Sequence, residues 1–227
     1  MKPSLLENHL QQISDNYDAI LPPDQKTYLK RLKDEGYEPL VIYDIGAGAL
    51  TWTRYAKSLW PNSIFIVFDA TESFKTLYES LNFEHHIGVL SNNQSVNKVV
   101  KFYQNEYFYS GNSYYREVDC QCFSYYDLDN YLELPTQTLD AIIKKKEFPW
   151  PDLIKIDVQG AEKDVLEGAK RCLSHCERMI VNLYHEESKL GAPRVYQFLP
   201  YISSLGWTCD APFFSDHGGD GEYGFSK

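Results

Sequence analysis

A glycine-containing turn with an acidic residue in front of it is the first feature that could bind a ligand. Residues 44–48 are Asp-Ile-Gly-Ala-Gly, between an apolar run typical of a strand and a predicted helix. Glycine lets the backbone approach a ligand closely, and N–H groups at a helix start can meet polar groups. The dinucleotide-binding motif has a third glycine where this chain has Thr51, preceded by the bulky Leu50. The turn therefore disfavours a pyrophosphate, and Asp44 favours a ligand that carries positive charge.

A second acidic residue, Asp69, ends the next apolar run, 21 residues after Gly48. A carboxylate at this place in an α/β sheet commonly holds a ribose diol, because it can accept two O–H hydrogen bonds. Leu90 and Ser91 end the third predicted strand and are expected near an adenine ring. An adenosine with a cationic amino-acid group satisfies both acidic residues, and S-adenosylmethionine is such a molecule.

Two further polar residues follow later predicted strands. Asp157 ends the fourth strand of the predicted sheet, and His185 follows the fifth. The ends of parallel strands meet at one edge of a sheet, so both residues are expected near the reacting part of a ligand. A carboxylate can orient or deprotonate an acceptor, and imidazole suits a proton acceptor at neutral pH. Asp157 and His185, with Glu186 or Asp216, could instead hold Mg²⁺, although no spacing signature supports it.

The five cysteines are an odd number in a chain whose start lacks the apolar stretch of an export signal, so a disulfide framework is not expected. Cys120 and Cys122 lie in a predicted strand, and Cys172 and Cys176, with His175 between them, lie near a predicted helix end. Neither pair has the two-residue spacing of common zinc knuckles. We predict reduced, mostly buried thiols and no metal.

The elements that must position these residues alternate between strands and helices, which predicts a mainly parallel sheet covered by helices. The N-terminal part to about Gly36 is predicted to be one or two helices broken at Pro22-Pro23. Strands are predicted at 40–44, 64–68, 86–90, 99–103, 117–123, 153–157, 179–184, 207–210 and 223–226, and helices at 51–59, 72–81, 127–132, 139–145, 160–173 and 195–205.

Two stretches are candidates for contacts that close over a ligand. Residues 113–116, Ser-Tyr-Tyr-Arg, follow the third strand of the predicted sheet beside Gly111, and a loop of this kind can move and exclude water. Residues 213–217 could contact an acceptor, and they precede a glycine-rich stretch that equally suits an ordinary turn.

Residues 154–162 are IKIDVQGAE, and residues 165–169 are VLEGA. These two segments are similar to the signature IKIDVEGAE with VL-x-GA of the FkbM-type S-adenosylmethionine-dependent methyltransferases, and the chain resembles this family from Val41 to Trp207. DIGA at 44–47 is similar to the start of the family's DIGAN-x-G turn, and Phe68-Asp69 to its Phe-Glu. This chain has Gln159 in place of Glu, Gly48 in place of Asn and Leu50 in place of Gly.

The resemblance implies a class I methyltransferase fold, a Rossmann-like α/β domain. Its seven-stranded, mostly parallel sheet has helices on both faces and one antiparallel strand near the C-terminus. It implies S-adenosylmethionine as the methyl donor and a hydroxyl of a sugar, a glycan or another small molecule as the acceptor, with nitrogen as an alternative acceptor atom. Residues 39–227 would form this domain, and residues 1–38 a helical segment packed on it. The predicted cofactor-binding residues are Asp44, Gly46, Ala47, Gly48, Asp69, Ala70, Leu90, Ser91 and Ser113, and the predicted catalytic residues are Asp157 and His185.

Composition limits the partners of this 227-residue chain. Lys and Arg number 22 and Asp and Glu 32, which gives a formal net charge of −10. A surface that is this negative disfavours nucleic acid and anionic membranes, and no apolar run is long enough to cross a bilayer. A cytoplasmic location is therefore predicted. Two alternatives stay open, a nicotinamide-dependent oxidoreductase and a non-catalytic protein that binds a nucleoside cofactor.

Overall fold

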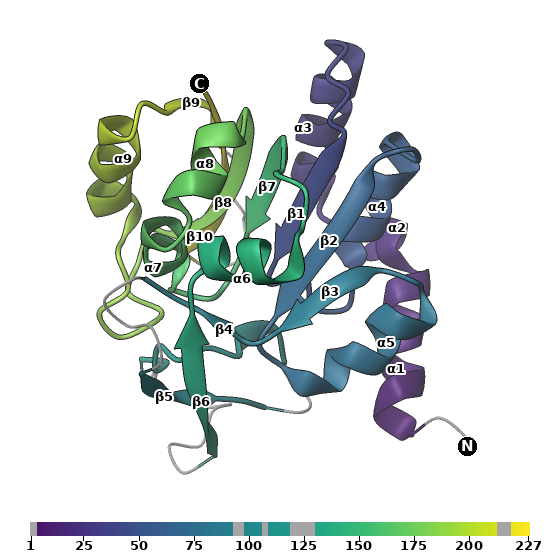
Figure 1. Ribbon diagram of the computed structural model, residues 1–227, viewed down its shortest axis with the longest axis vertical. Coiled ribbons are helices and arrows are strands. Elements are labelled where there is room, and N and C mark those ends of the chain that lie inside the picture. The colour runs from purple at the N-terminus through teal and green to yellow at the C-terminus, as the bar shows by residue number, and fades with distance from the viewer. Residues whose placement is uncertain (1–3, 93–97, 106–108, 119–129, 213–218) are drawn as a thin grey trace.

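A seven-stranded sheet lies between two groups of helices in the computed structural model (Figure 1). The structure describes residues 4–92, 98–105, 109–118, 130–212 and 219–227. The strand order is β3-β2-β1-β7-β8-β10-β9, and β10 is antiparallel to both of its neighbours while the other pairs are parallel. This confirms the predicted fold class. The strands are β1 (Val41–Ile45), β2 (Ile64–Asp69), β3 (Glu84–Ile87), β7 (Leu153–Ile156), β8 (Arg178–Tyr184), β9 (Thr208–Pro212) and β10 (Asp220–Ser226).

Alternate side chains of the central strands build a separate core on each face of the sheet, as the two-residue period of a strand requires. Tyr43 packs in the core with the helices of one face, whereas its neighbour Ile42 packs in the core of the other. The first face is covered by α6 (Leu139–Lys146), α7 (Glu162–Glu167), α8 (Lys170–His175) and α9 (Val195–Ser204). The second is covered by α3 (Pro23–Asp34) and α4 (Thr51–Leu59), with α5 (Lys75–Ser80) and the 3₁₀ turn η1 (Glu72–Phe74) beside them.

The N-terminal segment forms three helices that pack on the sheet domain, α1 (Leu5–Asp15), α2 (Tyr17–Ile20) and α3. One break falls at Pro22-Pro23 as predicted, with proline at the first turn of α3. A second break at Asn16 divides α1 from α2, so the segment has one helix more than predicted. Leu10 of α1 is buried with Leu50 and Val67, which places α1 against the start of α4 and the second strand. Helices α1 and α2 thus approach the edge of the sheet where the glycine turn is found, whereas α3 lies toward the opposite edge (Figure 1).

A small second sheet corrects the prediction for the middle of the chain. Its order is β4-β6-β5, with β4 (Val89–Leu90), β5 (Val99–Tyr103) and β6 (Tyr131–Gln137). The predicted helix at 127–132 is wrong where it is described, because Tyr131 and Leu132 begin β6 and pair with Tyr103 and Phe102. Pairing with a distant strand overrides the local helical preference there.

Two other predicted elements are divided by glycine. The predicted strand 86–90 is divided into β3 and β4 at Gly88, and the predicted helix 160–173 into α7 and α8 near Gly168. A Cβ at Gly168 would overlap the carbonyl oxygen of Ser91, so the chain needs glycine at this close approach. Of the predicted strand 117–123, Glu117 forms an isolated bridge with Lys189, and residues 119–123 lie outside the described part.

No helix in the described ranges is long and apolar enough to cross a membrane.

Candidate active site

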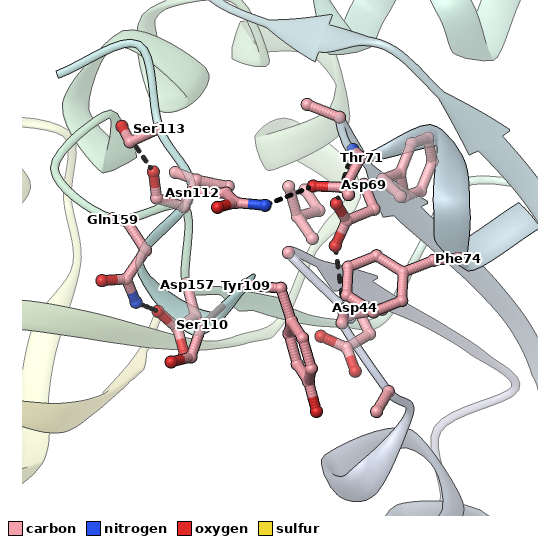
Figure 2. A pocket seen from close by; sticks show the side chains of 18 of the residues that line it. Asp44, Asp69, Thr71, Phe74, Tyr109, Ser110, Asn112, Ser113, Asp157 and Gln159 are labelled. Carbon is pink, nitrogen blue, oxygen red and sulfur yellow. Dashed lines mark hydrogen bonds between the residues drawn. The ribbon is translucent and has the colours of Figure 1, made fainter. Parts of the chain in front are cut away.

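A cavity of about 320 Å³ opens at the ends of β1, β2 and β7 (Figure 2). Of the eleven predicted site residues, nine line it, namely Asp44, Gly46, Ala47, Gly48, Asp69, Ala70, Leu90, Ser113 and Asp157. The structure therefore brings together at one edge of the sheet residues that are 113 positions apart in sequence, from 44 to 157.

The glycine turn is held by backbone hydrogen bonds to the neighbouring strand. The N–H groups of Gly46 and Ala47 donate to the carbonyl oxygen of Phe68 at 2.8 and 3.1 Å. Gly46 has φ +83°, and a Cβ there would overlap the carbonyl oxygen of Asp157. Glycine is required at this position because both the conformation and the close approach exclude a side chain.

Leu50, which stands where the related family has glycine, adopts the left-handed conformation itself, with φ 64°. Its side chain is fully buried with Leu10, Val67 and Phe74, and it is not among the cavity-lining residues. The left-handed conformation costs a non-glycine residue about 1 kcal/mol, and burial of the apolar side chain offsets that cost. The substitution therefore leaves the cavity open.

Asp44 is a buried carboxylate, of which one oxygen accepts a hydrogen bond and the other has no hydrogen-bond donor. Its side chain is 1% exposed, and Oδ2 accepts a hydrogen bond from the Thr53 hydroxyl at 2.5 Å. Oδ1 has no hydrogen-bond partner, and Lys155 Nζ lies 4.0 Å from it. Burial raises the pKa of Asp44, and the lysine and the threonine oppose that rise. A buried acceptor without a donor, in the wall of a cavity, fits a ligand that brings a positive charge or an N–H group.

Asp69 ties the glycine turn to the end of β2. Its Oδ2 accepts from the Gly48 N–H at 3.0 Å, and its Oδ1 accepts from the Thr71 N–H at 2.9 Å. Burial raises the pKa of Asp69, whereas these two backbone donors lower it. Each carboxylate oxygen retains a lone pair, so the group could still accept from a ribose diol. The Thr71 hydroxyl also accepts from Asn112 Nδ2 at 3.2 Å (Figure 2).

Lys155 lies in a buried group of carboxylates beneath the cavity. Its Nζ is 3.3 Å from Asp157 Oδ2, 3.9 Å from Glu222 Oε1 and 4.0 Å from Asp44 Oδ1. Burial lowers the pKa of Lys155, but these three carboxylates outweigh burial, and the net shift is upward. The lysine therefore stays charged and balances part of the negative charge.

Glu222 makes the stability of the fold depend on pH. Burial raises its pKa from 4.5 to about 8, although Lys155 opposes the rise. Between these two values the folded chain keeps a proton that the unfolded chain has released. The contribution of this group to stability is therefore complete below pH 4.5 and is lost as the pH rises toward 8.

Asp157 presents a partly exposed carboxylate to the cavity, with 27% of its side chain accessible. Gln159 Nε2 donates to its Oδ1 at 2.8 Å, and Asn182 Nδ2 lies 3.4 Å from the same oxygen. Glu162 fixes the loop that follows, because Oε1 accepts from the Val158 N–H at 3.0 Å and Oε2 from the Gly160 N–H at 3.1 Å. Burial raises the pKa of Glu162 to about 7.

The segment 109–118 forms the wall opposite the glycine turn. Tyr109, Ser110, Asn112, Ser113 and Tyr114 all line the cavity. The hydroxyls of Tyr114 and Tyr115 donate to Asp164 Oδ2 at 2.8 and 2.9 Å, and Lys189 Nζ donates to the Gly111 carbonyl at 2.7 Å. The segment is therefore anchored on α7 and on the stretch that follows β8.

The sequence comparison agrees with this geometry. Residues 44–207 match the family described as the Methyltransferase FkbM domain. The chain belongs to the FkbM methyltransferase family. The methyl donor of this domain is S-adenosylmethionine, which confirms that prediction over the nicotinamide alternative. No curated protein matches the chain.

The FkbM domain is similar in fold to several solved structures. A candidate O-methyltransferase from Nostoc punctiforme is 9% identical with a TM-score of 0.51, and the match covers 97% of this chain but only 61% of that one. An uncharacterised Listeria monocytogenes protein is 12% identical with a TM-score of 0.50, over 91% and 67% of the two chains. Human N-acetylserotonin methyltransferase, in complex with S-adenosylmethionine, is 14% identical with a TM-score of 0.49, over 98% and 55%.

Two predicted residues of the FkbM domain lie outside the cavity lining. The Ser91 hydroxyl is 3.3 Å from the Tyr114 hydroxyl, and the Ser91 side chain is buried behind that ring. His185 follows β8, and its Nε2 lies 3.2 Å from the Tyr223 hydroxyl. The strand-end argument placed both at the correct edge of the sheet, but it could not tell which side chains turn toward the cavity.

The metal alternatives gain no support within the described ranges. No group of three or more His, Cys, Asp and Glu side chains there is placed to hold a metal ion. Cys172 and Cys176 are buried free thiols, whereas Cys120, Cys122 and residues 213–217 lie outside the described part.

Sequence reasoning missed several residues that line the cavity. Ile13 and Ile20 reach it from the N-terminal helices, and Trp52, Phe74 and Tyr109 add aromatic walls. The apolar face of α1 could have indicated that Ile13 contacts a ligand, but an apolar helix face is equally typical of packing in a core.

Proposed function

We propose that this chain transfers the methyl group of S-adenosylmethionine to a hydroxyl group of a sugar, a glycan or another small molecule. The observation that carries the proposal is Asp157, a partly exposed carboxylate that lines the cavity one strand away from Asp44.

The residues of the cavity wall fit the donor. The open Oδ1 of Asp44 would accept from its ammonium group, and Asp69 from its ribose hydroxyls. Ala70 and Leu90 would flank the adenine ring, and Ser113 would contact the donor from the opposite wall. Glycine at position 46 lets the turn pack directly against the carbonyl oxygen of Asp157, with which a side chain would collide. When bound, S-adenosylmethionine supplies a methyl group that the acceptor oxygen takes as the carbon–sulfur bond breaks.

Asp157 is the group that we propose to orient the acceptor and take its proton. The hydroxyl proton passes to the carboxylate and from there to solvent, to which the side chain is partly exposed. Lys155 Nζ lies 3.3 Å from Oδ2 and holds this side of the carboxylate at the base of the cavity.

The charges around the cavity favour a neutral acceptor. In the described lining the cation is Lys155, which already faces Asp44, Asp157 and Glu222. A phosphate or carboxylate acceptor would find no uncompensated positive charge there and would be repelled. The polar side chains of Ser110, Asn112 and Gln159 suit hydrogen bonds to hydroxyl groups instead.

Labelled S-adenosylmethionine and a panel of sugars, phenols, amines and carboxylic acids test this proposal. We expect methyl transfer to a hydroxyl compound, and Asp157→Asn should lower turnover about 100-fold or more, as the loss of a general base does. His185→Ala tests the other predicted base. A loss in that variant alone would move the proton-accepting role to His185, and transfer only to amines or acids would contradict the proposal.

A further inference from the structure

Gln159 connects the Asp157 carboxylate to Tyr184 on the neighbouring strand. Its Nε2 donates to Asp157 Oδ1 at 2.8 Å, and its Oε1 accepts from the Tyr184 hydroxyl at 2.8 Å. Figure 2 shows the amide nitrogen of Gln159 directed at the carboxylate of Asp157 in the wall of the cavity. Of the side-chain hydrogen bonds to Asp157 within the described residues, this is the shortest.

The amide completes this chain of hydrogen bonds without adding charge. The ionised carboxylate of Asp157 can accept but not donate, and the Tyr184 hydroxyl donates toward Gln159. The residue between them must therefore accept on one side and donate on the other. A carboxylate at position 159 would accept from Tyr184 but would set a second negative charge against Asp157.

The backbone around Gln159 holds the amide in this direction. Gln159 has φ 57°, a conformation that L side chains rarely adopt, and Gly160 follows with φ +102°. A Cβ at Gly160 would lie 3.0 Å from the Ala192 Cβ, and Glu162 accepts from the Gly160 N–H. Such strained residues persist where the surroundings fix them, which is typical of functional sites.

The charges that face Asp157 come from every element packed around it. The groups that interact electrostatically with it are Lys155 of its own strand, Asp44 of β1, Tyr184 of β8, Asp220 and Glu222 of β10, and Glu162 of α7. Most of these groups are acidic, so a neutral donor beside Asp157 avoids the repulsion that a further carboxylate would add.

We propose that Gln159 is a positioning residue that holds the Asp157 carboxylate toward the methyl end of the cofactor while it adds no charge of its own. This inference rests on the place proposed above for Asp157, and it does not depend on the identity of the acceptor.

The test compares the affinities of S-adenosylmethionine and S-adenosylhomocysteine by calorimetric titration from pH 6 to pH 9. The two ligands differ in one methyl group and its positive charge, so the ratio of their dissociation constants reports the negative charge at the methyl end. The variants are Asp157→Asn, Gln159→Ala, Gln159→Glu and Tyr184→Phe. Gln11→Glu is the matched control, because Gln11 Nε2 also donates to an aspartate, Asp15, but at the surface and at 3.0 Å.

We expect Asp157→Asn, which removes the charge, and Gln159→Ala, which removes the hydrogen bond to it, each to lower the preference for S-adenosylmethionine by about three- to tenfold. Tyr184→Phe removes the hydroxyl that donates to Gln159 and should also lower the preference for S-adenosylmethionine. This variant tests the inference if Gln159→Ala does not fold. Gln159→Glu should make the preference rise with pH, because two adjacent carboxyls share a proton at the acid end. Gln11→Glu should match the wild type.

Two results would overturn the inference, and only the second would also contradict the role proposed for Asp157. If Asp157→Asn lowers the preference but the variants of Gln159 and Tyr184 do not, Asp157 needs no positioning amide. If Asp157→Asn leaves the preference unchanged as well, Asp157 does not face the methyl end, and its proposed catalytic place is also wrong.

Discussion

Replacing Asp69 with alanine removes a side chain that links the glycine turn, the end of β2 and the predicted ribose site. In the folded chain its two oxygens accept from the N–H groups of Gly48 and Thr71 at 3.0 and 2.9 Å. The variant leaves both backbone donors without this acceptor, and it leaves the ribose hydroxyls without a charged partner. Both cofactor affinity and stability should therefore decrease.

The expected size follows from these contacts. A hydrogen bond to a charged group contributes about 1.5–3 kcal/mol, and part of this is recovered when water enters the vacated space. We expect the binding free energy of the cofactor to weaken by about 1–3 kcal/mol, which is about 5- to 150-fold in affinity. The free energy of unfolding should decrease by about 1–3 kcal/mol, because two backbone donors lose their acceptor.

The assay separates the ribose end from the amino-acid end of the ligand. S-adenosylmethionine and adenosine are titrated into Asp69→Ala and into Asp44→Asn, and urea unfolding is followed in parallel. Asp69→Ala should weaken both ligands equally, since both carry the ribose. Asp44→Asn should weaken S-adenosylmethionine more than adenosine, which lacks the ammonium group. Folded Asp69→Ala that binds adenosine within about twofold of the wild type would refute the reasoning.

Further predictions concern the glycine turn and the buried acids. Gly46→Ala should unfold the protein at lower urea concentration and abolish cofactor binding, because its Cβ overlaps the Asp157 carbonyl. Gly48→Ala, whose Cβ meets nothing within 4 Å, should cost only about 1 kcal/mol for its positive φ, and equal losses in the two variants would contradict the turn geometry. Glu222→Gln should flatten the decrease in unfolding free energy between pH 5 and about 8, because its raised pKa of about 8 causes part of that decrease, and an unchanged slope in urea melts would show that another group is responsible.

The site could be predicted from sequence where chemistry follows from strand order. Asp44, Asp69 and Asp157 lie at or next to the ends of strands that the apolar pattern revealed, and parallel strands bring these ends to one edge. His185 and Ser91 obey the same rule and yet lie outside the cavity lining. The direction of a side chain that follows a strand depends on the conformation of the next loop. Loops have no regular alternation of side-chain direction, so the sequence pattern does not reveal it.

The apolar periods, the glycines and the acids at strand ends determined the α/β fold and indicated a nucleoside cofactor, because these features act over a few residues. Only the tertiary structure decided that residues 131–132 form a strand, since their partners in β5 lie about thirty positions away. It alone placed Ile13 and Ile20 in the cavity wall, turned Leu50 into the core and set Gln159 between Tyr184 and Asp157. These arrangements depend on packing between segments that are distant in sequence, and such packing leaves no local pattern in the chain.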